Sequence, residues 1–284
     1  MSNHNEDGEP DAVQVSKGAA ITTITINRGS YKNAVDARTA GKLTEAFLAF
    51  ENDPTQKVCV FHGANGTFCA GFDLQEVAKK SQPGYTGSQT EHHGRVDGRN
   101  IGPMGPSRMQ IRKPVISAVS GYAVAGGLEL SLLGDIRVAE EDAVFGVFCR
   151  RFGVPLIDGG TVRLQAIVGL GRALDMILTG RAVGAQEALM MGLANRVVPK
   201  GKSVEEAMSI AEMLVQFPQD CMNTDRNSCY YANYSAKSFE DALSHEYDEG
   251  IKVVDSEMVA GVTRFSKGEG RHGQFKEVKR EEKL

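Results

Sequence analysis

One carboxylate, Glu129, stands in the otherwise uncharged segment GYAVAGGLEL at residues 121–130. The glycine pair Gly126 and Gly127 precedes it and favours a tight turn into a helix. A helix that begins at Gly127 directs its unpaired N–H groups and the positive end of its dipole at this turn. Such an end stabilises an anion, including one that exists only in a transition state. Glu129 is therefore a candidate acid/base beside an anion-binding turn.

Local chemistry leaves the role of Glu129 open. The helix dipole lowers the pKa of an acid in the first turn, whereas partial burial against Leu128, Leu130 and Leu132 raises it. A glutamate at this place is also a common dipole partner with no catalytic role. The sequence therefore allows either a poised acid/base or a purely structural carboxylate.

A second glycine turn, FCAGFDL at residues 68–74, follows the strand-like run KVCVFHGA. Glycine permits a tight turn and a close approach of a ligand to the backbone. One peptide N–H from each of the two turns can then hold a single oxygen atom. Glycines after strands are common, so this pattern alone is a weak signal.

The elements that must position these turns alternate between strand and helix in the first two thirds of the chain. Apolar and β-branched runs predict strands at residues 19–28, 57–64, 113–121, 135–147 and 194–199. Helices are predicted after the N-cap Asp36, where Leu43, Ala46, Phe47 and Phe50 share a face, and then over 126–134, 158–180 and 184–193.

This order predicts an α/β core over residues 13–200, followed by a helical C-terminal region over residues 201–270. Residues 1–12 are polar and acidic, and we expect them to be disordered. Residues 271–284 form a charged tail. Residues 79–108 are rich in Gly, Ser, Pro and His, which predicts a mobile surface loop that can include a short helix.

Composition excludes several classes of protein. A net charge of −4 gives no basic footprint for nucleic acid. The five cysteines form no CxxC pair, which argues against a disulfide scaffold or zinc knuckle and favours a reducing compartment. No apolar run reaches the roughly 18 residues of a membrane span, and no targeting signal is evident, so a cytoplasmic location is expected. His92 and His93 lack a second ligand pair, so no metal site is expected.

Several motifs, taken together, resemble the crotonase superfamily, which is the enoyl-CoA hydratase/isomerase family. In chain order they are TINRGSYKNAV, NGTFCAGFDL, GYAVAGGLELSLLGDIRVA, GVPLIDGGTVRLQAIVG and LTGRAVGAQEALMMGLANRVVP. The resemblance is specific because the motifs occur in the right order and spacing. It implies an α/β fold, a crotonase-like ββα superhelix packed as a spiral core, with C-terminal helices that assemble homotrimers or dimers of trimers.

The resemblance also implies a binding site for an acyl-CoA thioester. The backbone N–H groups of Phe72 and Gly126 would form the oxyanion hole around the thioester oxygen. Coenzyme A would enter as part of the substrate, with no separate cofactor and no metal. The implied CoA contacts are Arg28 and Lys32 near the phosphates, Ala70, Asp73 and Leu74 around the adenine and pantetheine, and Ala34 and Tyr122.

Glu129 falls on the position of the first catalytic glutamate of the hydratases. The slot of the second glutamate holds Cys149, and no acid lies between residues 143 and 157. The next acid, Asp158, resembles in its place the aspartate of the dienoyl-CoA isomerases, so it is a candidate second acid/base. It is equally compatible with an N-cap for a helix that starts near Thr161.

Three hypotheses about function follow. The resemblance favours hydration of a trans-2-enoyl-CoA to a 3-hydroxyacyl-CoA, or the reverse reaction. The alternative is double-bond isomerisation of an enoyl- or dienoyl-CoA, with Glu129 and Asp158 as a proton shuttle. A non-catalytic acyl-CoA-binding module is the third hypothesis, and the retention of Glu129 argues against it.

Overall fold

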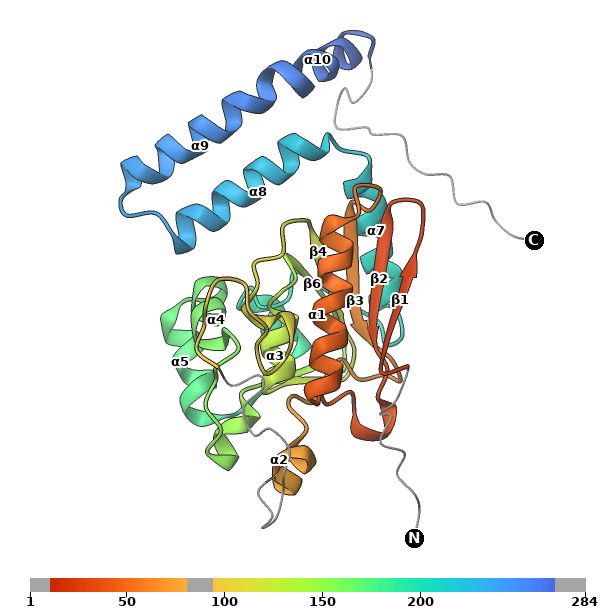
Figure 1. Cartoon of the computed structure of the whole chain (residues 1–284), viewed down its shortest axis with the longest axis vertical. Helices are drawn as coiled ribbons and strands as arrows, with labels where there is room; N and C mark the ends of the chain where they lie inside the picture. The colour runs from red at the N-terminus through yellow and green to blue at the C-terminus, as the bar shows by residue number, and fades with distance from the viewer. Residues whose placement is uncertain (1–10, 81–93, 269–284) are drawn as a thin grey trace, which may run out of the picture. The chain divides into compact units, whose positions relative to one another are not determined.

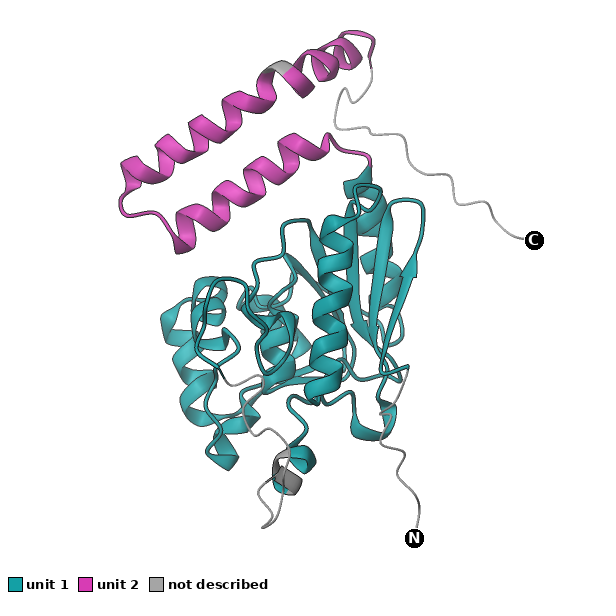
Figure 2. Ribbon diagram, in the orientation of Figure 1, with its two compact units in different colours: residues 1–215 teal, residues 216–284 magenta. Residues whose placement is uncertain are grey.

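The computed structural model describes residues 11–80 and 94–268 of the chain (Figure 1). The chain divides into two compact units, residues 1–215 and residues 216–284 (Figure 2). The predicted disorder of residues 1–10 and the predicted charged tail lie outside the described residues. Ala12 is buried, and its carbonyl accepts the N–H of Asn27, so the prediction of disorder is wrong for residue 12.

The first unit is built on a six-stranded sheet in the order β1-β2-β3-β4-β6-β9. Only the β1–β2 pair is antiparallel, and the other pairs are parallel. A second sheet joins three short strands in the order β5-β7-β8. The strands are β1 (Val13–Lys17), β2 (Ile21–Ile26), β3 (Val58–Gly63), β4 (Val115–Val119), β5 (Tyr122–Val124), β6 (Ile136–Glu140), β7 (Val144–Gly146), β8 (Ala182–Gly184) and β9 (Arg196–Val198).

The helices predicted in the first unit are present, and α2 is an additional helix that the sequence did not predict. Asp36 caps the first helix, because its Oδ1 accepts the backbone N–H of Thr39 at 2.7 Å. The predicted helix over 158–180 is interrupted at Gly169, where φ is +83°. The elements are α1 (Ala37–Asn52), α2 (Leu74–Lys80), α3 (Gly126–Ser131), α4 (Gly160–Val168), α5 (Leu170–Thr179), α6 (Ala185–Met190) and α7 (Ser203–Val215), with 3-10 turns η1 (Gly29–Tyr31), η2 (Pro106–Arg108) and η3 (Phe148–Phe152).

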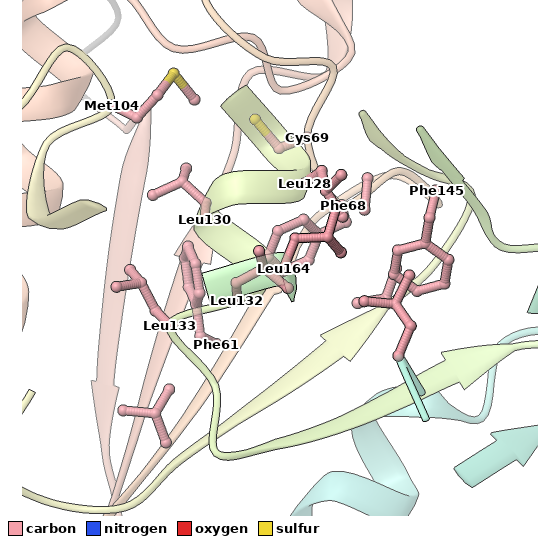
Figure 3. Close-up of a cluster of buried hydrophobic side chains, with 14 of the residues drawn as sticks. Phe61, Phe68, Cys69, Met104, Leu128, Leu130, Leu132, Leu133, Phe145 and Leu164 are labelled. Carbon is pink, nitrogen blue, oxygen red and sulfur yellow. The ribbon is translucent and has the colours of Figure 1, made fainter. Parts of the chain in front are cut away.

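Helices cover both faces of the larger sheet, because alternate residues of each strand point to opposite sides. On β3, Phe61 packs in the larger cluster, which includes residues of α1 and α3. Its neighbours Val58 and Val60 pack in a second cluster against Ala207 and Ile210 of α7. The larger cluster is drawn in Figure 3, where leucines of α3 meet Phe61 and Phe68.

Helix α7 belongs to this first unit, although the predicted boundary at residue 201 groups it with the C-terminal helices. Its buried residues Ala207, Ile210 and Ala211 pack on the sheet, and the compact unit ends only at Val215. The α/β fold with a helical C-terminal region is thus as predicted, while the division between the two starts later along the chain.

The predicted surface loop at 79–108 is wrong for its last part. Residues 81–93, with His92 and His93, lie outside the described residues. Residues 102–107 are buried, and Met104 and Ser107 are almost completely shielded from solvent. Glycine and proline predict irregular backbone here, but irregular backbone is buried where its polar groups find partners.

The second unit is helical: α8 (Gln219–Tyr234), α9 (Phe239–Val253), the π-turn η4 (Val254–Met258) and α10 (Val259–Ser266). Helices α8 and α9 pack as a hairpin, in which the ring of Tyr231 stacks on His245 at 3.8 Å. The Tyr231 hydroxyl donates to Asp241 at 3.0 Å. Across the described part of both units, no helix has the length and apolar character needed to cross a membrane.

Candidate active site

The two glycine turns predicted from the sequence lie side by side. Residue Cys69 pairs with Ala123 as a parallel bridge, and the N–H of Cys69 donates to the carbonyl of Tyr122 at 2.8 Å. A Cβ added at Gly71 would lie 3.1 Å from the backbone nitrogen of Gly126. The structure therefore brings the turn before Asp73 against the start of α3, which is the arrangement that a shared oxyanion site requires.

The backbone around Phe72 is extended and pairs on one side with Val35. The carbonyl of Gly71 accepts the N–H of Val35 at 2.8 Å, and the N–H of Asp73 donates to the carbonyl of Val35 at 2.9 Å. Because successive residues of an extended chain point in opposite directions, the N–H of Phe72 faces away from Val35. Gly126 is the first residue of α3, so its N–H has no acceptor within that helix. The oxyanion role of these two groups stays a prediction.

Glu129 is buried, with 3% of its surface exposed. Its Oε1 accepts the backbone N–H groups of Asp158 at 3.0 Å and Gly160 at 2.8 Å, where the chain enters α4. The pKa of Glu129 is raised to about 8, chiefly by burial and also by the negative charge of Asp158, while the two N–H donors and the charge of Arg163 act to lower it. Of the opposing effects expected from the sequence, burial therefore prevails.

Asp158 is equally buried and adjoins Glu129. Its Oδ1 accepts the backbone N–H of Met104 at 3.0 Å and the hydroxyl of Ser107. The N-cap interpretation of Asp158 is wrong, because Gly159 occupies the cap of α4 and no side chain caps that helix. The carboxylate turns instead to the buried segment at residues 102–107.

Cys149, in the slot of the second glutamate, lies in η3 and is buried. Burial raises the pKa of its thiol, and the nearby charge of Glu129 raises it further. A neutral thiol cannot replace a carboxylate as a base. Glu129 and Asp158 are therefore the pair of acids that the structure brings together.

Arg28 lies in a buried ion-pair cluster. Its guanidinium is buried and bonded to Asp36 at 3.1 Å and Asp73 at 3.2 Å, and it also donates to the carbonyl of Ala34. A cation enclosed by two carboxylates has a structural role, and its contact with the CoA phosphates stays a prediction. The pairing instead ties the turn that carries Phe72 to the cap of α1.

The other predicted CoA contacts differ in their exposure to solvent. Lys32 is exposed, and its Nζ lies 5.7 Å from the ring centre of Tyr122, itself 43% exposed. Leu74 is also exposed. Ala70 donates its N–H to the carbonyl of Lys32 at 3.0 Å, and Ala34 is buried. The binding roles of these residues remain predictions.

Sequence reasoning missed Met104, Ser107 and Arg163. The guanidinium of Arg163 donates to the carbonyls of Ser107 and Met109, the latter at 2.9 Å. Nothing in the composition of residues 102–109 distinguishes a buried segment that contacts the site from an exposed loop. The one available signal is that a short apolar run, IGPMGPSRMQI, interrupts a polar stretch.

Comparison with known proteins identifies the family. Residues 16–266 match the family described as enoyl-CoA hydratase/isomerase. The chain is 35% identical over 212 residues to the enoyl-CoA hydratase EchA19 of Mycobacterium tuberculosis, covering 72% of this chain and 74% of the relative. It is 33% identical over 210 residues to the carnitinyl-CoA dehydratase of Escherichia coli K12, covering 72% and 75%.

Solved structures agree with the sequence matches. The fold resembles that of an enoyl-CoA hydratase from Mycobacterium tuberculosis H37Rv with a TM-score of 0.80 and 29% identity, over 90% of this chain and 96% of the other. An enoyl-CoA hydratase from Bacillus anthracis gives a TM-score of 0.79 and 27% identity over the same shares. The chain has a crotonase fold and belongs to the enoyl-CoA hydratase/isomerase family of enzymes.

Proposed function

We propose that the protein catalyses addition of water to a trans-2-enoyl-CoA to form a 3-hydroxyacyl-CoA, or the reverse dehydration. The observation that carries the proposal is the buried Glu129, anchored through Oε1 beside the two adjoining glycine turns. Both relatives compared above are named for adding or removing water on a CoA thioester.

The backbone donors act on the thioester oxygen. The N–H groups of Phe72 and Gly126 hold this oxygen and stabilise the negative charge that it gains as an enolate. Two donors at a buried site cost no reorganisation when the charge appears, so they lower the barrier to attack at C3.

Glu129 moves the proton. Both hydrogen bonds that Glu129 accepts in the described part of the chain go to Oε1, so we assign proton transfer to Oε2. Oε2 takes a proton from water as the water oxygen bonds to C3, and the C2–C3 π electrons pass to the thioester oxygen. When the enolate collapses, the proton on Glu129 passes to C2, which adds one water in all.

Asp158 supports this exchange. Its negative charge raises the proton affinity of Glu129, which makes the glutamate a stronger base near neutral pH. A carboxylate with an ordinary pKa would hold the proton of water too weakly. Asp158 thus compensates for the missing second glutamate by acting on Glu129.

A second candidate function is double-bond isomerisation. It is favoured by the adjoining buried acids Glu129 and Asp158, since one can remove a proton from carbon and the other can return a proton at a different carbon. This reaction adds no oxygen to the product.

Incubation with crotonyl-CoA and a longer trans-2-enoyl-CoA in oxygen-18 water, followed by mass spectrometry, separates the two reactions. Hydration gives a 3-hydroxyacyl-CoA that carries the label. A product of unchanged mass supports isomerisation. If Glu129→Gln retains full turnover, the catalytic assignment fails for both reactions.

We also propose that the enzyme works as a homotrimer or dimer of trimers in the cytoplasm, with no cofactor beyond the CoA of its substrate. The exposed apolar residues of the second unit support a contact between copies, among them Phe239, Tyr247, Val262 and Phe265. Size-exclusion chromatography with light scattering tests this assembly.

A further inference from the structure

Ser107 is fully buried, and its hydroxyl donates a hydrogen bond to a carboxylate. Its Oγ donates to Oδ1 of Asp158, and the N–H of Met104 donates to the same oxygen at 3.0 Å. Hydrogen bonds to an ionised group are shorter and stronger than those between neutral groups. Two donors that converge on one oxygen hold the carboxylate both in position and in orientation.

The segment that carries Ser107 is held on its other side by Arg163. The guanidinium of Arg163, which lies in α4, donates to the carbonyls of Ser107 and Met109. There is little free space at this point, because a Cβ added at Gly102 would lie 2.6 Å from Oγ of Ser107. These contacts restrict the position of Ser107, and its hydroxyl points at Asp158.

We propose that Ser107 is a positioning residue of the reaction, whose hydroxyl keeps the Asp158 carboxylate charged and directed beside Glu129. The inference rests on the proposed function, in which Asp158 acts through Glu129. A donated hydrogen bond favours the charged form of a carboxylate. Consistent with this, the charge of Asp158 adds to burial in raising the pKa of Glu129.

The charged and titratable groups around Asp158 come from four elements. Glu129 approaches from α3, and Arg163 approaches from α4 and opposes the rise in the pKa of Glu129. Arg108 of η2 donates to the carbonyl of Ile157 at 3.5 Å, and Cys149 of η3 lies near Glu129. Removal of the Ser107 hydroxyl changes none of these charges directly, so its effect on pH dependence passes through Asp158.

The test compares S107A with S117A in the full-length chain. Ser117 of β4 is also completely buried, but its Oγ has no hydrogen-bond partner among residues 11–80 and 94–268. Hydration of crotonyl-CoA is measured from pH 6 to 10. For S107A we expect kcat to fall by about 10- to 100-fold, as for loss of a hydrogen bond to a charged group, with KM within about twofold.

The pH profile separates positioning from structural damage. Without the Ser107 hydroxyl, Asp158 takes up a proton more readily. Its negative charge then no longer raises the pKa of Glu129, so the rising limb of kcat/KM in S107A should move to lower pH. S117A should match the wild type. If S107A fails to fold by circular dichroism, S107C replaces it, because a thiol fills a similar volume and is a weaker donor; the same direction of change is expected.

Two further variants make failures distinguishable. Added to D158N, S107A should cause no further loss of kcat, because the two residues act as one unit. If D158N lowers kcat while S107A behaves as S117A, or loses kcat with no shift of the limb, the role of Ser107 is overturned and the proposed function stands. If E129Q keeps turnover, the proposed function itself fails.

Discussion

The backbone N–H of Asp158 lies 3.0 Å from Oε1 of Glu129, so the main chain of one buried acid anchors the side chain of the other. The carboxylate of Asp158 has its own donors, in Met104 and Ser107. The two acids are thus held next to each other by separate sets of hydrogen bonds. Their charges interact strongly because both groups are removed from water.

Activity should rise with pH in the range where Glu129 loses its proton. Burial and Asp158 raise the pKa of Glu129 to about 8, and only the carboxylate can take a proton from water. We therefore expect kcat/KM for crotonyl-CoA to rise from pH 6, to reach half of its maximum near pH 8 and to level off above about pH 9. The midpoint belongs to the pair of acids rather than to Glu129 alone. A profile that is already level at pH 6 would contradict this account.

The free energy of unfolding should also depend on pH through the titration of Glu129. The pKa of Glu129 is raised from 4.5 to about 8 in the folded chain, so the folded state binds the proton more tightly than the unfolded state. The contribution of this bound proton to folding stability is complete below pH 4.5 and is lost as pH rises to about 8.

Glu129→Gln removes this titration and keeps an oxygen that can accept the same N–H groups. In urea unfolding, its stability relative to the wild type should increase between pH 4.5 and 8 by at most about 1.4 kcal/mol per pH unit. The difference should be constant above about pH 9. A difference that is independent of pH from 5 to 8 would show that Glu129 titrates at an ordinary pH.

Gly160→Ala should reduce activity far more than stability. The added Cβ would lie 2.8 Å from Oε1 and 2.9 Å from Cγ of Glu129, so this side chain must shift to accommodate it. A displacement of this acid by about 1 Å is expected to lower kcat about 100-fold. The matched control is Gly171→Ala in α5, where nothing lies within 4 Å of the new Cβ.

Gly171→Ala should leave kcat unchanged and raise the free energy of unfolding by up to about 1 kcal/mol, since alanine favours a helix over glycine. Steady-state kinetics and urea unfolding of both variants provide the comparison. Equal activity of the two variants would mean that Glu129 tolerates displacement.

Arg28→Met should destabilise the first unit. It leaves the buried Asp73 and the partly buried Asp36 without their cation, and loss of one partner from a buried ion pair costs about 3–5 kcal/mol. The control is Arg196→Met, which breaks the surface pair with Glu206 and should cost at most about 1 kcal/mol. Similar urea midpoints for the two variants would show that Arg28 is not the structural group that its partners indicate.

Local patterns in the sequence were sufficient for much of the fold. The apolar face of α1 and its cap at Asp36 follow from helical spacing and from a side chain that accepts a nearby N–H. Strand β1 was not predicted, because its alternating run VQVS is short and four of its five residues are exposed. β1 pairs with β2 as an antiparallel hairpin, and the tertiary structure decides this pairing.

The sequence by itself determined the chemical groups of the candidate site: two glycine turns after strands, and Glu129 just after the second turn. The tertiary structure decided which groups meet. Ser107 and Asp158 are 51 residues apart, and Arg28 and Asp73 are 45 residues apart. Such pairs depend on the path of the chain through the core, which spacing along the sequence does not encode. The burial that raises the pKa of Glu129 exists only when this core is assembled.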